Sequence, residues 1–192
     1  MKIIHILNTN SYSGAENVAI TIINRMKSEY DMTYVSPDGK IREYLKQNDI
    51  KYEPIKELST KELKRIINKY KPDIVHAHDF RASTIMAFSN LPVKLISHVH
   101  KNDPRMKKVN MYSIIYLLSC IKYKKILLVS EIIKEEFMFR KFVDKKMEVI
   151  GNPIDKNKIL QLSKEKEVNQ IYDIAYLGRM SKEKNPLKFI NI

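Results

Sequence analysis

Cysteine, glycine and long apolar runs are all scarce in this chain, and each shortage excludes a class of protein. Its 192 residues include one cysteine and four glycines. A single cysteine forbids an internal disulfide and fits a reducing compartment. The glycines form neither a G-x-G-x-x-G dinucleotide fingerprint nor a P-loop. The sequence therefore predicts neither a disulfide scaffold nor a protein built on one of these two phosphate-binding motifs.

The apolar runs are too short to cross a membrane, which needs about 20 residues. The longest extends from Met111 to Ile121, and the apolar stretch near the N-terminus is broken by His5. Neither is typical of a signal peptide or a membrane span. Because the chain is 44% hydrophobic, it has ample material for a core. We expect a soluble or peripheral cytoplasmic protein in which Cys120, set in an apolar helical run, is a buried thiol.

Positive charge dominates and is unevenly distributed. The net charge is +13, and the stretch from Lys101 to Lys146 contributes +7. General lysine richness, an anionic membrane surface and nucleic acid are competing explanations. Nucleic acid is disfavoured because no helix-turn-helix, aromatic RNA-binding strand or Cys/His metal spacing accompanies the charge. The apolar run inside the basic stretch is compatible with an interfacial helix at the inner face of the cell membrane, and equally with a core helix that has basic ends.

Short β-rich runs alternate with helical patterns along the chain. This alternation predicts an α/β fold, a Rossmann-like doubly wound parallel sheet covered by helices on both faces. Thr60 is expected to cap the third helix. The expected strands are residues 2–7, 32–35, 51–55, 73–77, 94–99, 126–129 and 147–150, and the expected helices are 15–27, 41–47, 60–70, 81–88, 107–122 and 131–139.

The pattern changes after the last of these strands. The turn-forming sequence Gly151–Asp155 suggests a boundary, which gives a domain at residues 1–155 and a polar linker at 156–171. From Tyr172 an apolar strand pattern leads into a Gly-Arg turn and a Lys- and Pro-containing helix start. We expect residues 172–192 to be the truncated start of a second domain, because one strand and a helical turn cannot bury a core.

Candidate binding residues follow the expected strands, where open parallel sheets bind their ligands. After the first strand, Ser13, Gly14 and Glu16 precede or open a helix, where backbone N–H groups can approach an anion or a sugar hydroxyl. A tight turn that needs a small residue explains Gly14 equally well. Near the end of the chain, the basic turn containing Arg179 and Lys184 could hold a diphosphate or be a solvated turn.

Four histidines form two H-x-H pairs near strand ends. Within each pair the two side chains share one side of the strand, His76 with His78 and His98 with His100. A metal site could be built from these pairs, but neither cysteine ligands nor an H-E-x-x-H motif supports it, so no metal is expected. His100 closes its strand and is the better candidate for a catalytic cleft residue, whereas His76 and His98 fit buried, hydrogen-bonded histidines.

The order of these short motifs resembles the family 4 glycosyltransferases of GT-B fold, above all bacterial enzymes of capsule or exopolysaccharide assembly. The resemblance covers essentially the whole chain. It is carried by S-G-A-E at 13–16, D-I-V-H-A-H at 73–78, H-V-H at 98–100, L-L-V-S at 127–130, V-I-G-N-P-I-D at 149–155 and Y-L-G-R-M-S-K-E-K-N at 176–185.

The resemblance implies two Rossmann-like domains facing across a cleft, the first binding the acceptor and the second a nucleotide sugar. It implies transfer with retention and no metal or other cofactor. By the same resemblance His100 contacts the transferred sugar, Gly14 lies with Ser13, Glu16 and His98 at the acceptor and phosphate edge, and Arg179 and Lys184 stabilise the leaving diphosphate. Asn152, Pro153 and Asp155 match the interdomain hinge.

Two departures from the family pattern qualify these expectations. Many relatives have two glycines before A-E, whereas this chain has Ser13-Gly14, and the family's paired-glutamate donor motif is not present. We therefore expect an acceptor half of a sugar transferase, acting on a saccharide or lipid-linked acceptor and inactive alone. The alternative is a non-catalytic acceptor-binding module, or one subunit of a split transferase whose partner chain supplies the donor domain.

Overall fold

The computed structural model describes residues 1–165, 171–178, 180–181 and 184–190. These residues divide into two compact units, Met1–Ile154 and Asp155–Ile192, which are considered separately.

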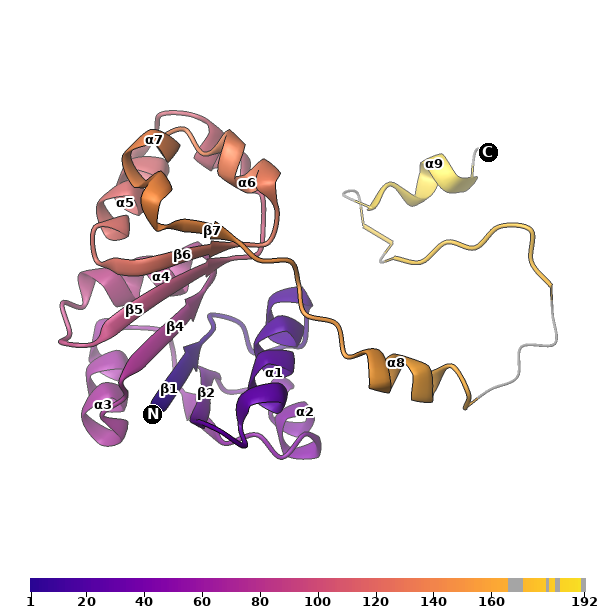
Figure 1. Ribbon diagram of the computed structural model, residues 1–192, viewed down its shortest axis with the longest axis horizontal. Coiled ribbons are helices and arrows are strands. Elements are labelled where there is room, and N and C mark those ends of the chain that lie inside the picture. The colour runs from indigo at the N-terminus through magenta and orange to yellow at the C-terminus, as the bar shows by residue number, and fades with distance from the viewer. Residues whose placement is uncertain (166–170, 179, 182–183, 191–192) are drawn as a thin grey trace. The chain divides into compact units, whose positions relative to one another are not determined.

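The first unit is built on a sheet of seven parallel strands in the order β3-β2-β1-β4-β5-β6-β7 (Figure 1). Consecutive strands run outward from β1 to β3 in one direction, and from β4 to β7 in the other. The change of direction lies between β1 and β4, which pair directly. The strands are β1 (Lys2–Ile6), β2 (Asp31–Pro37), β3 (Tyr52–Ile55), β4 (Ile74–His78), β5 (Lys94–Val99), β6 (Tyr123–Leu128) and β7 (Met147–Val149).

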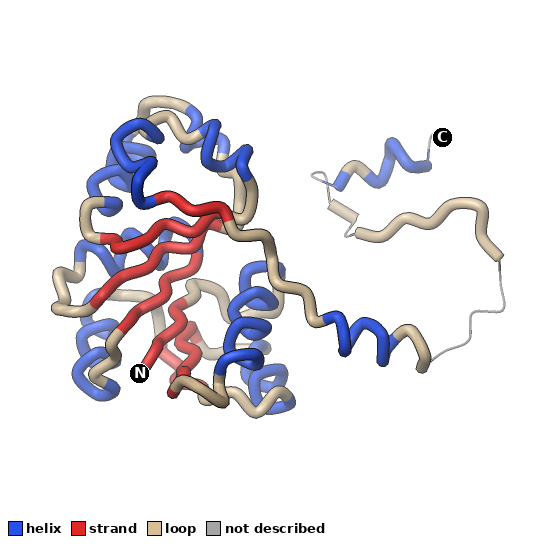
Figure 2. The backbone as a smooth tube through the Cα atoms, viewed as in Figure 1, coloured by secondary structure: helices blue, strands red, loops and turns tan. Residues whose placement is uncertain are grey.

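Helices cover both faces of this sheet (Figure 2). On one face, α1 and α2 pack with Ile3, Leu7 and Tyr34 in one apolar cluster. On the other, α3, α4 and α5 pack with Ile4, Ile6 and their neighbours in a larger cluster, which extends to the elements around β7. The fold is therefore the expected Rossmann-like doubly wound α/β sheet. The helices are α1 (Gly14–Met26), α2 (Ile41–Gln47), α3 (Thr60–Tyr70), α4 (Asp79–Phe88), α5 (Met111–Cys120), α6 (Glu131–Glu136) and α7 (Arg140–Val143), with 3₁₀ turns η1 (Pro104–Lys107) and η2 (Asp144–Lys146).

Three local expectations are corrected by capping and turn chemistry. Ser59, not Thr60, caps α3, because its hydroxyl accepts a hydrogen bond from the Glu62 amide. The expected helix over residues 107–122 begins only at Met111, after η1, because Asn110 and Ser113 form a capping box there. The expected helix over 131–139 ends at Glu136, and the chain resumes helical structure only in α7.

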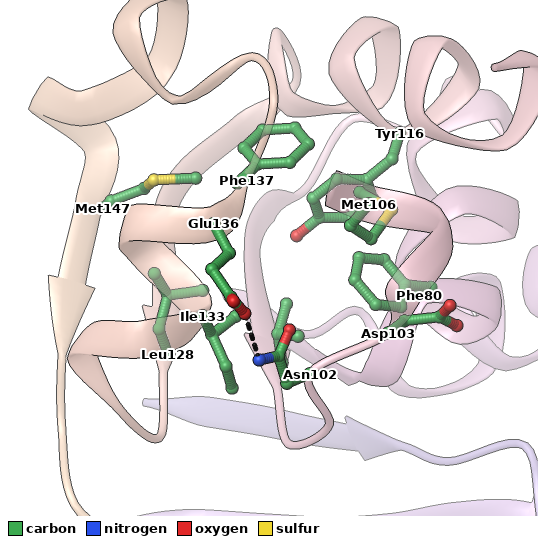
Figure 3. A pocket seen from close by; sticks show the side chains of 11 residues that line it. Phe80, Asn102, Asp103, Met106, Tyr116, Leu128, Ile133, Glu136, Phe137 and Met147 are labelled. Carbon is green, nitrogen blue, oxygen red and sulfur yellow. Dashed lines mark hydrogen bonds between the residues drawn. The ribbon is translucent and has the colours of Figure 1, made fainter. Parts of the chain in front are cut away.

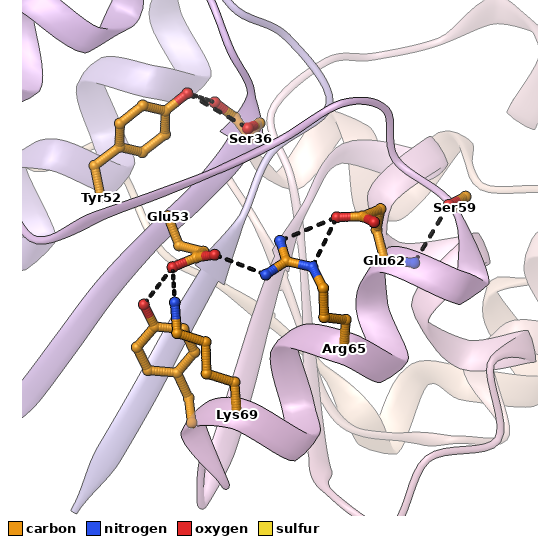
Figure 4. Close-up of polar contacts among 8 residues, drawn as sticks. Ser36, Tyr52, Glu53, Ser59, Glu62, Arg65 and Lys69 are labelled. Carbon is orange, nitrogen blue, oxygen red and sulfur yellow. Dashed lines mark hydrogen bonds and ion pairs between the residues drawn. The ribbon is translucent and has the colours of Figure 1, made fainter.

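The edge strand β3 is tied to α3 by a charge cluster around Glu53 (Figure 4). The Glu53 carboxylate accepts hydrogen bonds from Arg65 at 2.9 Å and from Lys69 and Tyr70 at 2.6 Å each. Partial burial alone would raise the pKa of Glu53, but the hydrogen bonds from Lys69, Tyr70 and Arg65 outweigh it and lower the pKa to about 2. The cluster fixes the edge strand on its helix through polar contacts.

The second unit contains α8 (Lys156–Leu162) and α9 (Pro186–Ile190). Residues 171–178 are described without regular structure, so the strand expected from Tyr172 is wrong for this segment. Their apolar side chains are exposed, Ile171 by 96% and Leu177 by 102%. No core therefore covers these side chains within the described part of the unit.

Among the described residues, no helix is both long and apolar enough to cross a lipid bilayer.

Candidate functional site

The strand order reverses between β1 and β4, so a ligand crevice is expected at the carboxyl ends of these strands. In a doubly wound sheet, the connections on either side of the point where the order reverses diverge to opposite faces and leave room for a ligand. Here β1 is followed by the loop that carries Ser13 and Gly14, and β4 by Asp79 at the start of α4. Next to β4, β5 is followed by His100. The first-loop residues and His100 thus follow the strands on either side of β4, at the carboxyl edge of the sheet.

The first loop is organised around a buried carboxylate. Glu16 is 2% exposed, and its two oxygens accept hydrogen bonds from the Thr9 and Ser13 hydroxyls. As an acid in the first turn of α1, it also lies at the positive end of the helix dipole. The negative charge is therefore held in place, and the loop that precedes α1 is fixed to its first turn.

Gly14 has neither a positive φ nor a crowded surrounding. A Cβ added at Gly14 would meet no atom within 4 Å, and no glycine of the described chain has a positive φ. The tight-turn explanation for this glycine is therefore not supported by the backbone. Its lack of a side chain leaves the N-terminus of α1 open to a neighbouring group.

All five histidines of the chain gather on one face of the sheet, the face on which Ile3 and Leu7 pack with α1. Strand register places His5 of β1 beside His76 of β4, and His78 beside His98 of β5. Two-residue alternation adds His100 on the same side. The rings of His76 and His98 are stacked at 5.2 Å between centroids, and those of His78 and His100 at 5.1 Å.

Hydrogen bonds join these imidazoles into a chain of three and a pair. In the chain, His78 contacts His5 Nδ1 through its Nε2 at 3.1 Å and His100 Nε2 through its Nδ1 at 2.8 Å. In the pair, His76 Nε2 contacts His98 Nδ1 at 3.2 Å. The expectation that His76 and His98 are buried and hydrogen-bonded is confirmed.

Burial keeps these rings neutral. Desolvation is the largest cause of the lowered pKa of each ring, and repulsion between neighbouring imidazoles lowers the pKa further in four of the five. It lowers the pKa of His98 to about 4 and those of His5 and His100 to about 3, and lowers those of His76 and His78 well below 6.5. Within the described chain, His5 Nε2, His98 Nε2 and His100 Nδ1 are buried with no hydrogen-bond partner.

Asp79 links β4 to the end of β5. Its backbone has φ 62°, a left-handed conformation that is uncommon outside glycine and better tolerated by Asp and Asn. Its carboxylate accepts a hydrogen bond from the His100 amide at 3.1 Å. Burial, with a contribution from the Glu16 charge, raises the pKa of Asp79. Strained backbone at a strand end is a recurrent feature of binding sites.

The remaining expected site residues belong to other parts of the chain. Asn152 and Pro153 lie at the end of the first unit, where Arg25 donates a 2.7 Å hydrogen bond to the Ile154 carbonyl and holds the segment to α1. Asp155 and the exposed Lys184 belong to the second unit. Arg179 lies outside the described residues.

A second hollow, between β5–β6 and the helices, is too small to be a ligand site (Figure 3). It encloses about 10 Å³, roughly the space of one water molecule. Its lining is mainly apolar, with Phe80, Tyr116 and Phe137 among the residues that face it, and Asn102 donates a hydrogen bond to Glu136 at its rim. This hollow is a packing defect of the core.

The outer face of α5 carries an apolar stripe. Met111, Ile114, Leu118 and Ile121 are 74%, 38%, 49% and 69% exposed, at the three- and four-residue spacing of one helix face. The opposite side of α5 is buried, and Cys120 is fully buried there with a pKa raised to about 12 by desolvation. The buried-thiol expectation is confirmed. The helix α5 is thus a core helix on its buried side, and its outer side carries exposed apolar residues.

Sequence reasoning overlooked three members of this edge. His5 was interpreted only as a break in an apolar run, although its odd-numbered position places it on the face of Ile3 and Leu7. Asp79 gave no signal, because a positive φ is not readable from one residue type. Thr9 is visible only once its hydroxyl is seen to reach Glu16.

The comparison with known protein families matches the part of the chain that carries most of the candidate site residues. The family model described as Glycosyltransferase Family 4 matches residues 12–158. The chain belongs to this family. A search of curated proteins gives no match. The matched range of this Family 4 chain contains Gly14, the H-x-H pairs and the Asn152–Asp155 segment, and ends before Arg179.

Solved structures share the fold at low identity. Alr3699/HepE of Anabaena, solved in complex with UDP, superposes with a TM-score of 0.70 at 17% identity over 82% of this chain and 45% of its own. The lipopolysaccharide outer core galactosyltransferase WaaB gives 0.59 and 21%, over 80% and 46%. UDP-GlcNAc 2-epimerase of Methanocaldococcus jannaschii gives 0.56 and 17%, over 79% and 46%. The Family 4 chain thus spans somewhat less than half the length of these proteins.

Proposed function

We propose that this chain is the acceptor-binding half of a retaining glycosyltransferase, which transfers a sugar from a nucleotide-sugar donor to a saccharide or lipid-linked acceptor in cell-surface polysaccharide synthesis of capsule or exopolysaccharide type. The observation that carries the proposal is the Family 4 match over the β1–β4 crevice and its histidines. Two of the similar solved structures were obtained with UDP and UDP-glucose. The fold alone does not support sugar transfer, because an epimerase has a similar fold.

In this proposal, the crevice residues divide the work by their chemistry. His100 is half-buried at the strand end and contacts the transferred sugar through a ring nitrogen. Its orientation is held by the contact with His78 at 2.8 Å and by the amide bond to Asp79. The open N-terminus of α1 at Gly14 offers backbone N–H groups to an acceptor hydroxyl or phosphate. No resident metal or other cofactor takes part in the transfer.

The donor side is proposed to lie outside the first unit. Arg179 and Lys184 would neutralise the leaving diphosphate, as paired cations do for phosphate groups. Asn152, Pro153 and Asp155 would form the hinge. The nucleotide pocket would be supplied by a further domain, in the same polypeptide or in a partner chain, because this chain spans less than half of the similar structures. By itself the chain is proposed to bind acceptor without catalysing transfer.

Binding experiments distinguish this proposal from a nucleotide-binding module. Radiolabelled UDP-sugars and other nucleotide sugars are titrated against the chain alone, and acceptor saccharides are titrated in parallel by ligand-observed NMR. Weak or no nucleotide-sugar binding, with saccharide signals that are lost in His100→Ala, is the expected result. Tight nucleotide-sugar binding by this chain would contradict the division between the two halves.

A second candidate property is peripheral binding to an anionic membrane, carried by the exposed stripe of α5. Lys107, Lys108, Lys122, Lys124 and Lys125 flank the helix at both ends. Apolar side chains bordered by lysines suit the interface of an anionic bilayer, where each nearby cation adds about 1 kcal/mol. This placement would bring a lipid-linked acceptor to the protein at the inner membrane face.

Vesicle sedimentation tests the membrane placement. The protein is expected to pellet with anionic vesicles at low salt and to be released at high salt, because screening weakens the lysine contribution. Leu118→Glu should reduce binding, whereas Phe142→Glu, at a position 79% exposed on α7 and outside the stripe, should leave it unchanged. Equal binding to neutral and anionic vesicles would contradict the electrostatic part.

A further inference from the structure

Three imidazoles at the end of this cluster converge closely enough to share one ion. Ligand nitrogens of His78, His98 and His100 all lie within 4.8 Å of one another. In a tetrahedral site with metal–nitrogen bonds of about 2.0–2.1 Å, two ligand nitrogens lie roughly 3.4 Å apart. Nitrogens of His78 and His100 already lie 2.8 Å apart. Small ring rotations would therefore bring the three groups into ligating positions.

The hydrogen-bond pattern of the cluster suits a cation. A neutral imidazole offers one nitrogen lone pair, and its other nitrogen can donate to a partner. His98 Nε2 is buried and has no hydrogen-bond partner in the described chain, while Nδ1 of the same ring contacts His76 Nε2. Donation from Nδ1 to His76 leaves Nε2 of His98 as the free ligand. A metal-bound histidine is commonly oriented in this way by a partner at its other nitrogen.

The two ends of the cluster differ in access. The group formed by His5, His76 and His78 also meets the distance condition, but all three side chains are buried. In the group of His78, His98 and His100, the last is half-buried at the carboxyl edge of β5. An ion can therefore reach the second group through His100, and solvent can occupy a fourth coordination position there.

We propose that His78, His98 and His100 form a binding site for a single divalent transition-metal ion that prefers imidazole ligands, with Zn²⁺ as the representative ion. Three protein nitrogens with one open position are a ligand set that zinc accepts, and the same donors suit Ni²⁺ and Cu²⁺. His5 and His76 are the partners of the ligands His78 and His98. The ion is a bound ligand of the protein and takes no part in the proposed sugar transfer.

One consequence rests on the function proposed above. A metal on His100 withdraws that ring from the sugar, so Zn²⁺ would inhibit transfer, whereas a chelator would leave transfer intact. The binding of the ion itself does not depend on this role. Failure of transfer with intact metal binding would therefore contradict the proposed function alone.

Direct metal titration tests the site. Chelator-treated protein, freed of chelator, is titrated with Zn²⁺ against a chromophoric indicator, and bound metal is counted after gel filtration. One equivalent is expected. His98→Gln and His100→Gln should each weaken binding by more than about 100-fold, beyond the about 10- to 100-fold typical of a partner of a ligand. Cys120→Ser, which removes the chain's only thiol, should leave affinity unchanged.

A rescue variant separates lost ligation from lost folding. His100→Cys replaces one zinc ligand by another and should retain binding, with the thiolate charge-transfer absorption of the Co²⁺-substituted protein as its signature. His5→Gln, which removes the partner of the ligand His78, should cost about 10- to 100-fold and so less than the loss of a ligand. Loss of binding in His5→Gln with retention in His100→Gln would place the ion in the fully buried group and overturn the proposal. Substoichiometric or undetectable Zn²⁺ in the wild-type protein would overturn it as well.

Discussion

The buried histidines make the stability of the metal-free protein unusually sensitive to mild acid. Each ring is neutral in the folded state. Burial lowers the pKa of His98 to about 4, and burial together with repulsion from His98 lowers the pKa values of His5 and His100 to about 3. In the unfolded chain the same groups titrate near 6.5. Because the folded pKa is depressed, the unfolded state takes up more protons, and stability present above pH 6.5 is lost as the pH falls.

The size of the effect follows from the linkage relation. Lowering the pH from 7.5 to 6.0 protonates about three quarters of each unfolded histidine and costs roughly 0.8 kcal/mol per ring that stays neutral when folded. Five such rings cost about 4 kcal/mol, a large part of the about 5–15 kcal/mol that stabilises a typical domain. Carboxylates add little in this range, because their pKa values lie lower.

Urea denaturation in the presence of EDTA at pH 7.5, 7.0, 6.5 and 6.0 measures this loss. The free energy of unfolding should fall by several kcal/mol, and the fall should be about one fifth smaller in His98→Gln, which removes one titrating ring. A change of less than about 1 kcal/mol over this interval would refute the reasoning, since it would mean that the histidines are solvated and titrate in the folded protein.

Three further substitutions test other parts of the fold by thermal or urea denaturation. Ser59→Ala should destabilise by about 1 kcal/mol through the lost cap, whereas Thr60→Ala should cost little, and the reverse ranking would restore Thr60 as the cap. Glu53→Gln should destabilise by about 1–2 kcal/mol at pH 7 and reduce the acid sensitivity between pH 4.5 and 2, because the lowered pKa is stabilising above pH 4.5. Asp79→Asn should be tolerated, while Asp79→Ala should cost about 2 kcal/mol from its φ of 62° and the lost hydrogen bond to His100, and equal stability of the two would argue against strain there.

The sheet could be predicted from sequence because its determinants are local and repeated. Apolar strands and amphipathic helices alternate with short connections, and the two-residue period assigns each strand residue to a face. Helix limits were less predictable where two capping residues compete, as at Ser59 and Thr60, or where a 3₁₀ turn precedes the capping box at Asn110. Such choices depend on which hydroxyl reaches which amide.

The candidate site was only partly predictable, because it depends on the pairing of distant strands. The two H-x-H pairs were visible, and their position at strand ends was correct. That His5 joins them follows from β1 lying next to β4, which places residues 71 positions apart in register. The hydrogen bond of Asp79 to the His100 amide likewise depends on β4–β5 pairing. Neither the β1–β4 pairing nor the β4–β5 pairing can be predicted from the sequence pattern alone.

Sugar transfer itself is the most direct measurement of the central claim. Membranes from cells producing the protein that carries this chain are supplied with radiolabelled nucleotide sugars and any donor domain encoded beside it, and incorporation into saccharide or lipid acceptors is counted. Incorporation by wild type, with a loss of about 100-fold or more in a folded His100→Ala variant, is predicted. Equal incorporation by wild type and His100→Ala, or none by wild type with every donor, would contradict the account.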